Sequence, residues 1–79
     1  MAKKSPSFAG NPLLVKIGIE IRETRKSQGF SQEALADKAG IDRSYIGGIE
    51  RGEHNIAIIN LHKISSALGI KLFRLFENV

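Results

Sequence analysis

The sequence predicts an all-α fold, a compact domain of five helices. Apolar residues recur at intervals of three and four along most of the chain, which is the spacing of one face of a helix. Glycines separate these segments, and no segment alternates apolar and polar residues as a half-buried strand does. The 79 residues include no cysteine, so helix packing must hold the fold together without disulfide bonds or a thiolate zinc site.

The first helix is expected to follow a flexible tail. Residues 1–10 combine Lys, Ser, Pro and Gly with few apolar side chains, a composition typical of a mobile terminus. Asn11 is a favourable N-cap, and Pro12 fits the first turn of a helix that ends near Gly29. The buried stripe of this helix comprises Leu14, Ile17 and Ile21. The folded domain is therefore expected to cover residues 11–79.

Two short helices joined by a tight turn come next. Ser31 is a good N-cap for the first and Asp42 for the second, because their side-chain oxygens accept hydrogen bonds from the first helical N–H groups. Gly40 and Gly52 end them, since glycine readily adopts the left-handed conformation that follows many helices. The residues expected to pack the two helices together are Leu35, Ala36, Ala39, Ile46 and Ile49. This arrangement is a helix-turn-helix.

A fourth and a fifth helix are expected in the C-terminal part. The fourth runs from Ile58 to Leu68, and its apolar face comprises Ile58, Leu61, Ile64 and Leu68. The fifth lies within "KLFRLFENV", residues 71–79. Its side chains expected to pack on the core are Leu72, Leu75 and Phe76.

The apolar character of this last segment also predicts self-association. Large apolar side chains that remain exposed on a monomer usually mark an interface. We expect a homodimer, and the residues assigned to its interface are Ile70, Phe73, Phe76 and Val79. The alternative is a satellite cluster of the core within one chain.

Charge and composition narrow the possible functions. Twelve Lys and Arg against eight Asp and Glu give a net charge of +4, which favours an anionic partner such as a nucleic acid. No apolar run approaches the roughly 20 residues that span a bilayer, and the basic N-terminus lacks the apolar region of a signal peptide. We therefore expect a cytoplasmic protein with no membrane partner. The two histidines lack catalytic or metal-ligand spacing, so no enzymatic activity, metal or cofactor is expected.

The second and third predicted helices carry a distinctive pattern of residues. It comprises Gln32, Leu35, Ala36, Ala39-Gly40-Ile41, Ile46 and Ile49-Glu50-Arg51-Gly52. On these residues the chain resembles the Cro/C1-type (lambda-repressor-like, XRE) helix-turn-helix domains, and the resemblance extends over residues 13–76. Ala57 and Lys71 depart from it, because they stand where the family usually has Ser N-caps for the fourth and fifth helices.

The resemblance implies a sequence-specific regulator of transcription that binds double-stranded DNA. Such domains place the third helix in the major groove with its first residues at base edges. The expected base readers are Arg43, Ser44 and Tyr45. The planar fork of Arg43 suits guanine O6 and N7. The alternatives are a polar first-turn residue for Ser44 and a packing role for Tyr45.

Gly47 and Gly48 stand side by side in the third helix, where each costs about 1 kcal/mol relative to Ala. They are expected near the DNA face, where the missing side chains let the helix backbone approach the duplex closely. The alternative is a poorly formed helix. The other residues expected at the DNA backbone are Gln32, Arg51, His54 and Asn55. A solvated charge is the alternative for Arg51, and turn formation is the alternative for His54 and Asn55.

The resemblance also implies a structural ion pair. In the family, the Glu of the "ERG" triplet commonly pairs with an Arg near the end of the first helix. These residues are Glu50 and Arg25 in this sequence. We expect the pair to tie the third helix to the first and not to face DNA.

Among the branches of the family, "IDRSYIGGIERGEHN" in so short a chain most resembles the controller proteins of restriction-modification systems. The implied function is a dimer that binds a near-palindromic operator in its own promoter, with RNA polymerase as a further partner if the protein activates transcription. A phage- or plasmid-type repressor and an antitoxin-like autoregulator are alternatives. A protein-interaction module that has lost DNA binding is another.

Overall fold

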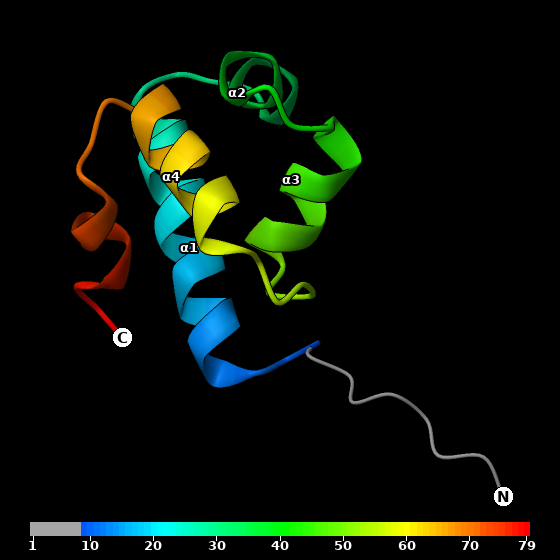
Figure 1. Cartoon of the computed structure of the whole chain (residues 1–79), viewed down its shortest axis with the longest axis vertical. Coiled ribbons are helices and arrows are strands. Elements are labelled where there is room, and N and C mark those ends of the chain that lie inside the picture. The colour runs from blue at the N-terminus through cyan, green and yellow to red at the C-terminus, as the bar shows by residue number, and fades with distance from the viewer. Residues whose placement is uncertain (1–8) are drawn as a thin grey trace, which may run out of the picture.

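The computed structural model describes residues 9–79, and this part of the chain forms four α-helices followed by a short 3-10 helix (Figure 1). The helices are α1 (Pro12–Ser27), α2 (Gln32–Ala39), α3 (Arg43–Glu50) and α4 (Ile58–Ala67), and the 3-10 helix is η1 (Leu72–Phe76). The described residues contain no strand. Of the tail expected at residues 1–10, residues 1–8 lie outside the described part of the chain. No helix within residues 9–79 combines the length and the apolarity that crossing a membrane requires.

The first three helices begin at the N-caps that the sequence predicted. The side chain of Asn11 accepts a hydrogen bond from the N–H of Leu13 at 3.0 Å, and Ser31 accepts one from Ala34 at 3.0 Å. Asp42 accepts one from Ser44 at 3.0 Å. Each bond satisfies an N–H group that the helix itself leaves unpaired. Ala57 and Lys71, by contrast, offer no side-chain cap to α4 and η1.

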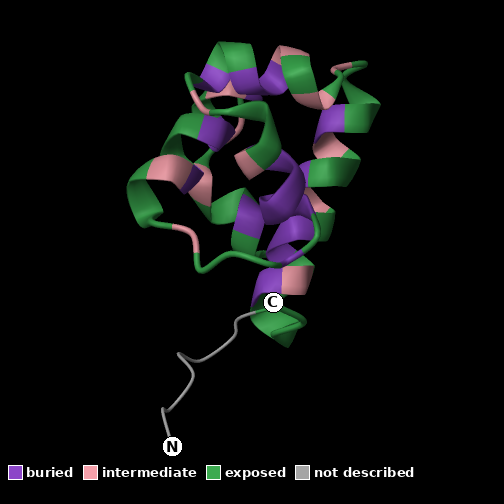
Figure 2. Ribbon diagram, turned by 90° about the vertical axis from the view of Figure 1, so that its right-hand side faces the viewer, coloured by how far each residue is buried: buried purple, intermediate pink, exposed green. Residues whose placement is uncertain are grey.

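The helices surround one apolar core. α3 packs against both α1 and α2, α4 packs against α2, and η1 packs against α1 and α4. Figure 2 shows that the buried segments of the ribbon face the interior of the molecule. The largest fully buried apolar side chains come from every element, namely Ile21, Leu35, Ile46, Ile64 and Leu75.

α1 and α3 approach closely at Gly18. A Cβ atom added there would lie 2.5 Å from the carbonyl oxygen of Ile49 and 2.6 Å from that of Glu50. Because both neighbours are backbone atoms that cannot move freely, only glycine allows this crossing. The close approach fixes α3 on α1 and so determines which face of α3 points outward.

The C-terminal segment differs from the expected fifth α-helix. It forms a five-residue 3-10 helix, in which residues three apart eclipse one another because a turn contains three residues. Leu72 and Leu75 therefore face the core, whereas Phe73 and Phe76 share the outer side and are 60% and 37% exposed. The expectation that Phe76 packs on the core was wrong for this reason.

Two isoleucines, Ile58 and Ile70, also differ from expectation. Ile58 is the first residue of α4 and is 57% exposed, so the buried face of that helix begins only at Leu61. Ile70 was assigned to an exposed interface, but it is half-buried and packs against the core. The remaining exposed apolar residues of the segment are Phe73, Phe76 and Val79.

Candidate nucleic-acid interface

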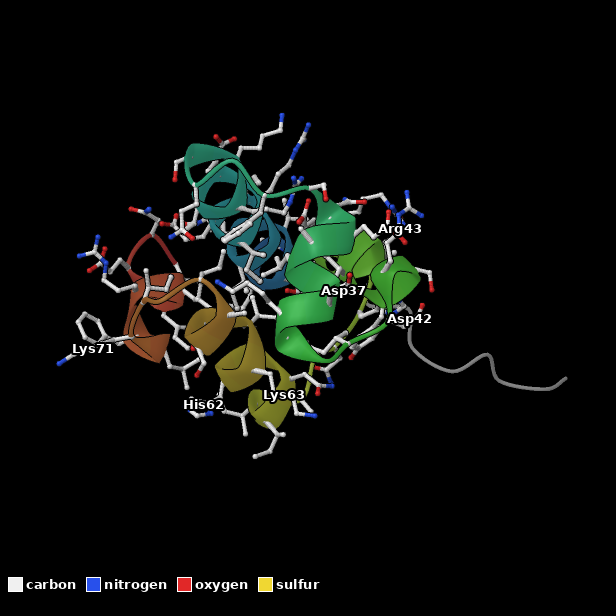
Figure 3. The ribbon with its side chains drawn as sticks, turned by 90° about the horizontal axis from the view of Figure 1, so that it is seen from above. Asp37, Asp42, Arg43, His62, Lys63 and Lys71 are labelled. Atoms are coloured by element: carbon white, nitrogen blue, oxygen red, sulfur yellow. The ribbon has the colours of Figure 1, made fainter. Side chains whose placement is uncertain are left out.

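The turn between α2 and α3 sets the direction of α3. Gly40 ends α2 in the left-handed conformation, with a φ of 68°, and the N–H of Ile41 donates to the carbonyl oxygen of Ala36 at 3.0 Å. The chain then enters α3 directly at the Asp42 cap. This turn leaves Asp42, Arg43 and Ser44 exposed at the start of α3, and Figure 3 shows Asp42 and Arg43 at the outer edge of the molecule.

Arg43 and Ser44, two of the predicted base readers, differ in how they are engaged. No side chain within residues 9–79 forms a hydrogen bond or ion pair with the Arg43 guanidinium, so its donors remain available. The Ser44 hydroxyl donates to the carboxylate of Asp42. Ser44 can therefore still accept a hydrogen bond, but its proton is committed to the helix cap.

The charge of Asp42 is stabilised by the same cap. The Ser44 hydroxyl and then the Ser44 N–H donate to the Asp42 carboxylate and lower its pKa. The adjacent positive charge of Arg43 acts in the same direction. Asp42 thus stays ionised beside the first turn of α3, where a negative charge also suits the helix dipole.

Tyr45, the third predicted base reader, is half-buried beside the loop that follows α3. Its ring lies 5.0 Å from the ring of His54, centroid to centroid, at an interplanar angle of 41°. His54 is exposed, as is Asn55. Among the described residues, no side-chain hydrogen bond engages Asn55.

Gly47 and Gly48 are covered by side chains of the chain itself. Both are buried. A Cβ atom at Gly47 would lie 3.1 Å from an Arg51 guanidinium nitrogen, and one at Gly48 would lie only 2.2 Å from Nε2 of His54. The backbone of Gly48 is therefore not open, because the His54 ring occupies the space that the missing side chain leaves. The approach of this part of α3 to DNA stays a prediction.

Arg25 and Glu50 form an ion pair in the interior, with a distance of 2.7 Å from Nε to Oε2 and of 2.9 Å from the second guanidinium nitrogen to Oε1. Arg25 also donates to the carbonyl oxygen of Phe30 at 2.8 Å. The hydrogen bond from Glu50 raises the pKa of Arg25. Within residues 9–79 every buried side-chain nitrogen and oxygen has a partner. The pair joins α1 to α3 and does not face the outer surface of α3.

A cationic cleft of about 250 Å³ lies where α1, α2 and α3 meet, and it is lined by Arg22, Arg25, Gln32, Glu50 and Arg51. The amide of Gln32 donates to Glu50 at 3.1 Å, and Arg51 pairs with Glu53 at 2.8 Å. Because Arg25 neutralises Glu50 and Arg51 pairs with Glu53, Arg22 is the cation of the cleft that no side chain within residues 9–79 pairs with. Arg22 was not among the residues expected at the DNA backbone, because the local sequence does not show that α1 lies beside the start of α2 and the end of α3.

Comparisons with known proteins agree with this geometry. A family described as Helix-turn-helix matches residues 21–75. The control protein C.MunI of a Mycoplasma species is 37% identical over 70 residues, which cover 87% of this chain and 95% of that protein. Two solved controller proteins of restriction-modification systems superpose on it with a TM-score of 0.79. C.AhdI from Aeromonas hydrophila is 49% identical, and the superposition covers 80% of this chain and 96% of C.AhdI. C.Esp1396I, bound to a 19 base pair DNA duplex, is 38% identical, and the superposition covers 86% of this chain and 91% of C.Esp1396I.

Proposed function

Because the chain belongs to the helix-turn-helix family and resembles controller proteins of restriction-modification systems, we propose that it binds double-stranded DNA sequence-specifically and regulates transcription. The observation that carries the proposal is the likeness of nearly the whole domain to C.Esp1396I bound to a DNA duplex. The proposed role is that of a regulator and not of an enzyme. A cytoplasmic location follows from the proposed target.

In the proposed complex the start of α3 enters the major groove. Arg43 donates two hydrogen bonds to O6 and N7 of a guanine, the contact for which its planar fork is best suited. Its exposed guanidinium supports this role, because within residues 9–79 no side-chain bond must be broken before the base is bound. Tyr45, two residues after Arg43, contacts a thymine methyl group or a phosphate. The Ser44 hydroxyl oxygen accepts a hydrogen bond from a base amino group.

The cationic cleft faces the DNA backbone in this arrangement. Gln32 stands at the first position of α2, whose N–H groups present the positive end of the helix dipole. Arg22 and Arg51 add charge, and the exposed pair between Arg51 and Glu53 costs little to exchange for a phosphate. We assign Gln32, Arg22 and Arg51 to phosphate contacts, with Asn55 as a further contact from the loop.

The active species is a homodimer formed through the C-terminal segment. Phe73, Phe76 and Val79 are exposed together on a single chain, and such a group of apolar side chains is normally covered. A two-fold dimer would bury them and present two copies of α3 about 34 Å apart, one helical turn of DNA. The expected target is therefore a near-palindromic operator. By likeness to the controller proteins, this operator lies in the promoter of the protein itself, and an activator would also touch RNA polymerase.

Selection of bound duplexes from a random pool tests the proposal. The expected product is a near-palindromic consensus with a guanine in each half-site. The affinity for that consensus should fall steeply as the salt concentration rises, because each neutralised phosphate releases counterions. A folded chain that enriches no sequence and binds no duplex at low salt would instead be a protein-interaction module, and the proposal would be wrong.

A further inference from the structure

The position of His54 explains why residue 48 in α3 is a glycine. A Cβ atom at Gly48 would lie 2.2 Å from Nε2 and 2.4 Å from Cδ2 of His54, which is far inside van der Waals contact. The ring of His54 thus rests directly on the helix backbone. At Gly47, by contrast, a Cβ atom would lie 3.1 Å from the far end of the flexible Arg51 side chain and 3.6 Å, an ordinary contact distance, from Oε1 of Gln32.

The backbone of the following loop places His54 there. The N–H of Glu53 donates to the carbonyl oxygen of Gly48 at 3.0 Å, and the N–H of Gly52 donates to Ile49 at 3.0 Å. Gly52 has a φ of +72° and lies so close to α1 that a Cβ atom would be 2.8 Å from Cα of Val15. The chain is therefore held on both α3 and α1 immediately before His54, and it turns the imidazole back onto α3.

The His54 ring, held on Gly48, also contacts the ring of Tyr45. Residues 45 and 48 are three apart in α3 and so lie on one face of the helix. The His54 ring, seated on Gly48, lies 5.0 Å from the Tyr45 ring and forms one wall for it. Tyr45 also packs against the apolar core, so His54 supplies the outer wall of its site, and loss of this wall would expose more of the Tyr45 ring and leave it less restrained.

We propose that His54 is a positioning residue for base recognition: its ring, admitted by the bare backbone of Gly48, holds Tyr45 in the orientation in which Tyr45 meets DNA. The inference deepens the proposed function and depends on it. Ordering Tyr45 before binding removes an entropic cost that specific recognition would otherwise bear. The inference concerns the contact of Tyr45 with a thymine methyl group. Contacts between cationic side chains and phosphates do not need Tyr45, so His54 acts on the preference among sequences more than on the affinity for all DNA.

The chain carries one tyrosine and no tryptophan, which provides a direct test. Intrinsic fluorescence of the 79-residue chain reports Tyr45 alone, so acrylamide quenching and steady-state anisotropy measure the exposure and mobility of Tyr45. His54→Ala should raise the quenching constant and lower the anisotropy. It should also reduce the ratio of affinities for the selected operator and an unrelated duplex, by about tenfold if the coupling is typical of contacting residues.

A double-mutant cycle isolates the role of Gly48. Gly48→Ala should displace the ring and reproduce the fluorescence and selectivity changes of His54→Ala, whereas Gly48→Ala in the His54→Ala background should change neither further. Gly47→Ala is the matched control, because it makes the same change of helix propensity where only the end of Arg51 must shift. His54→Phe keeps a ring without its polar atoms and should restore both properties.

Circular dichroism first verifies that each variant is folded, and Gly48→Ala replaces His54→Ala in the test if His54→Ala is not folded. The proposal is overturned if the wild-type chain discriminates between duplexes and His54→Ala discriminates equally well. It is also overturned if His54→Phe fails to restore selectivity, because the ring would then act through its nitrogen atoms. A wild-type chain that prefers no duplex refutes the proposed function instead, and the fluorescence of Tyr45 still tests the contact itself.

Discussion

Arg43 stands at the first position of α3 with an exposed guanidinium that no side chain in the described part of the chain engages. Arg43→Ala should weaken operator binding by about 1–3 kcal/mol and relax the preference at one base pair in each half-site. Arg43→Lys is the control, because it keeps the charge and loses the fork. Quantitative binding to a panel of single-substituted operators measures both effects. Equal loss on every sequence would assign Arg43 to the phosphates.

The Arg25–Glu50 ion pair gives a second prediction at the scale of single residues, which concerns the stability of the fold. Both side chains are almost fully buried, with 9% and 2% of their surface exposed. Removing one partner leaves the other charge without compensation, so Arg25→Met should lower the free energy of unfolding by about 3–5 kcal/mol. Urea denaturation measures this change. The double variant Arg25→Met with Glu50→Leu should recover most of the loss, and a single variant as stable as the wild type would contradict the interpretation.

How far single residues could be predicted depended on whether their partners were near in sequence. Asn11, Ser31 and Asp42 were found as caps because a cap contacts N–H groups two or three residues away. The two glycines predicted a close approach to the backbone of α3, but the sequence could not show that the His54 ring is what approaches Gly48. That contact depends on how the loop after α3 folds back, which no local rule determines.

At the scale of elements, the α-helices were predicted well and the last element was not. A period of three or four residues fits both an α-helix and a 3-10 helix over so short a segment as "LFRLF". In an α-helix residue 76 would share a face with residues 72 and 75, whereas in a 3-10 helix it does not. The packing of η1 against α1 and α4, which the local sequence does not determine, selects the 3-10 form. Ile70, directly before this segment, is half-buried against the core, which its position in the sequence did not indicate.

The cap of α3 gives a prediction about pH. The pKa of Asp42 is lowered in the folded protein, first by the Ser44 hydroxyl, so the folded state binds fewer protons than the unfolded state. The stabilisation is complete above the ordinary pKa of Asp, about 3.9, and is lost as the pH falls through that value toward the lower pKa of the folded state. Thermal unfolding from about pH 5 downward measures it. Asp42→Asn keeps a cap that does not titrate and should show a shallower dependence; an unchanged slope would contradict the assignment.

At the scale of the whole molecule, the groups available to DNA and those available to another protein chain lie on different elements. The exposed start of α3 and the cationic cleft belong to α1, α2 and α3, whereas the exposed phenylalanines belong to η1. Figure 3 shows Lys71, directly before η1, on the opposite side of the molecule from Arg43. A dimer joined through η1 therefore leaves both copies of α3 uncovered, which is the geometry that two half-sites require.

Phe73 provides the test of this arrangement, because it is 60% exposed on one chain and lies on the outer side of η1 beside Phe76. Phe73→Asp places a charge in the proposed interface without disturbing Leu72 and Leu75, so it should yield a folded monomer with unchanged helix content. Analytical ultracentrifugation measures the mass. Binding to a complete operator should fall toward that of a single half-site, because the two copies of α3 are no longer linked. Ile59→Asp is the matched control: Ile59 is 63% exposed in the first turn of α4 and is not part of the proposed interface, so this variant should remain dimeric. A Phe73→Asp variant that sediments as a dimer would place the interface elsewhere on the molecule.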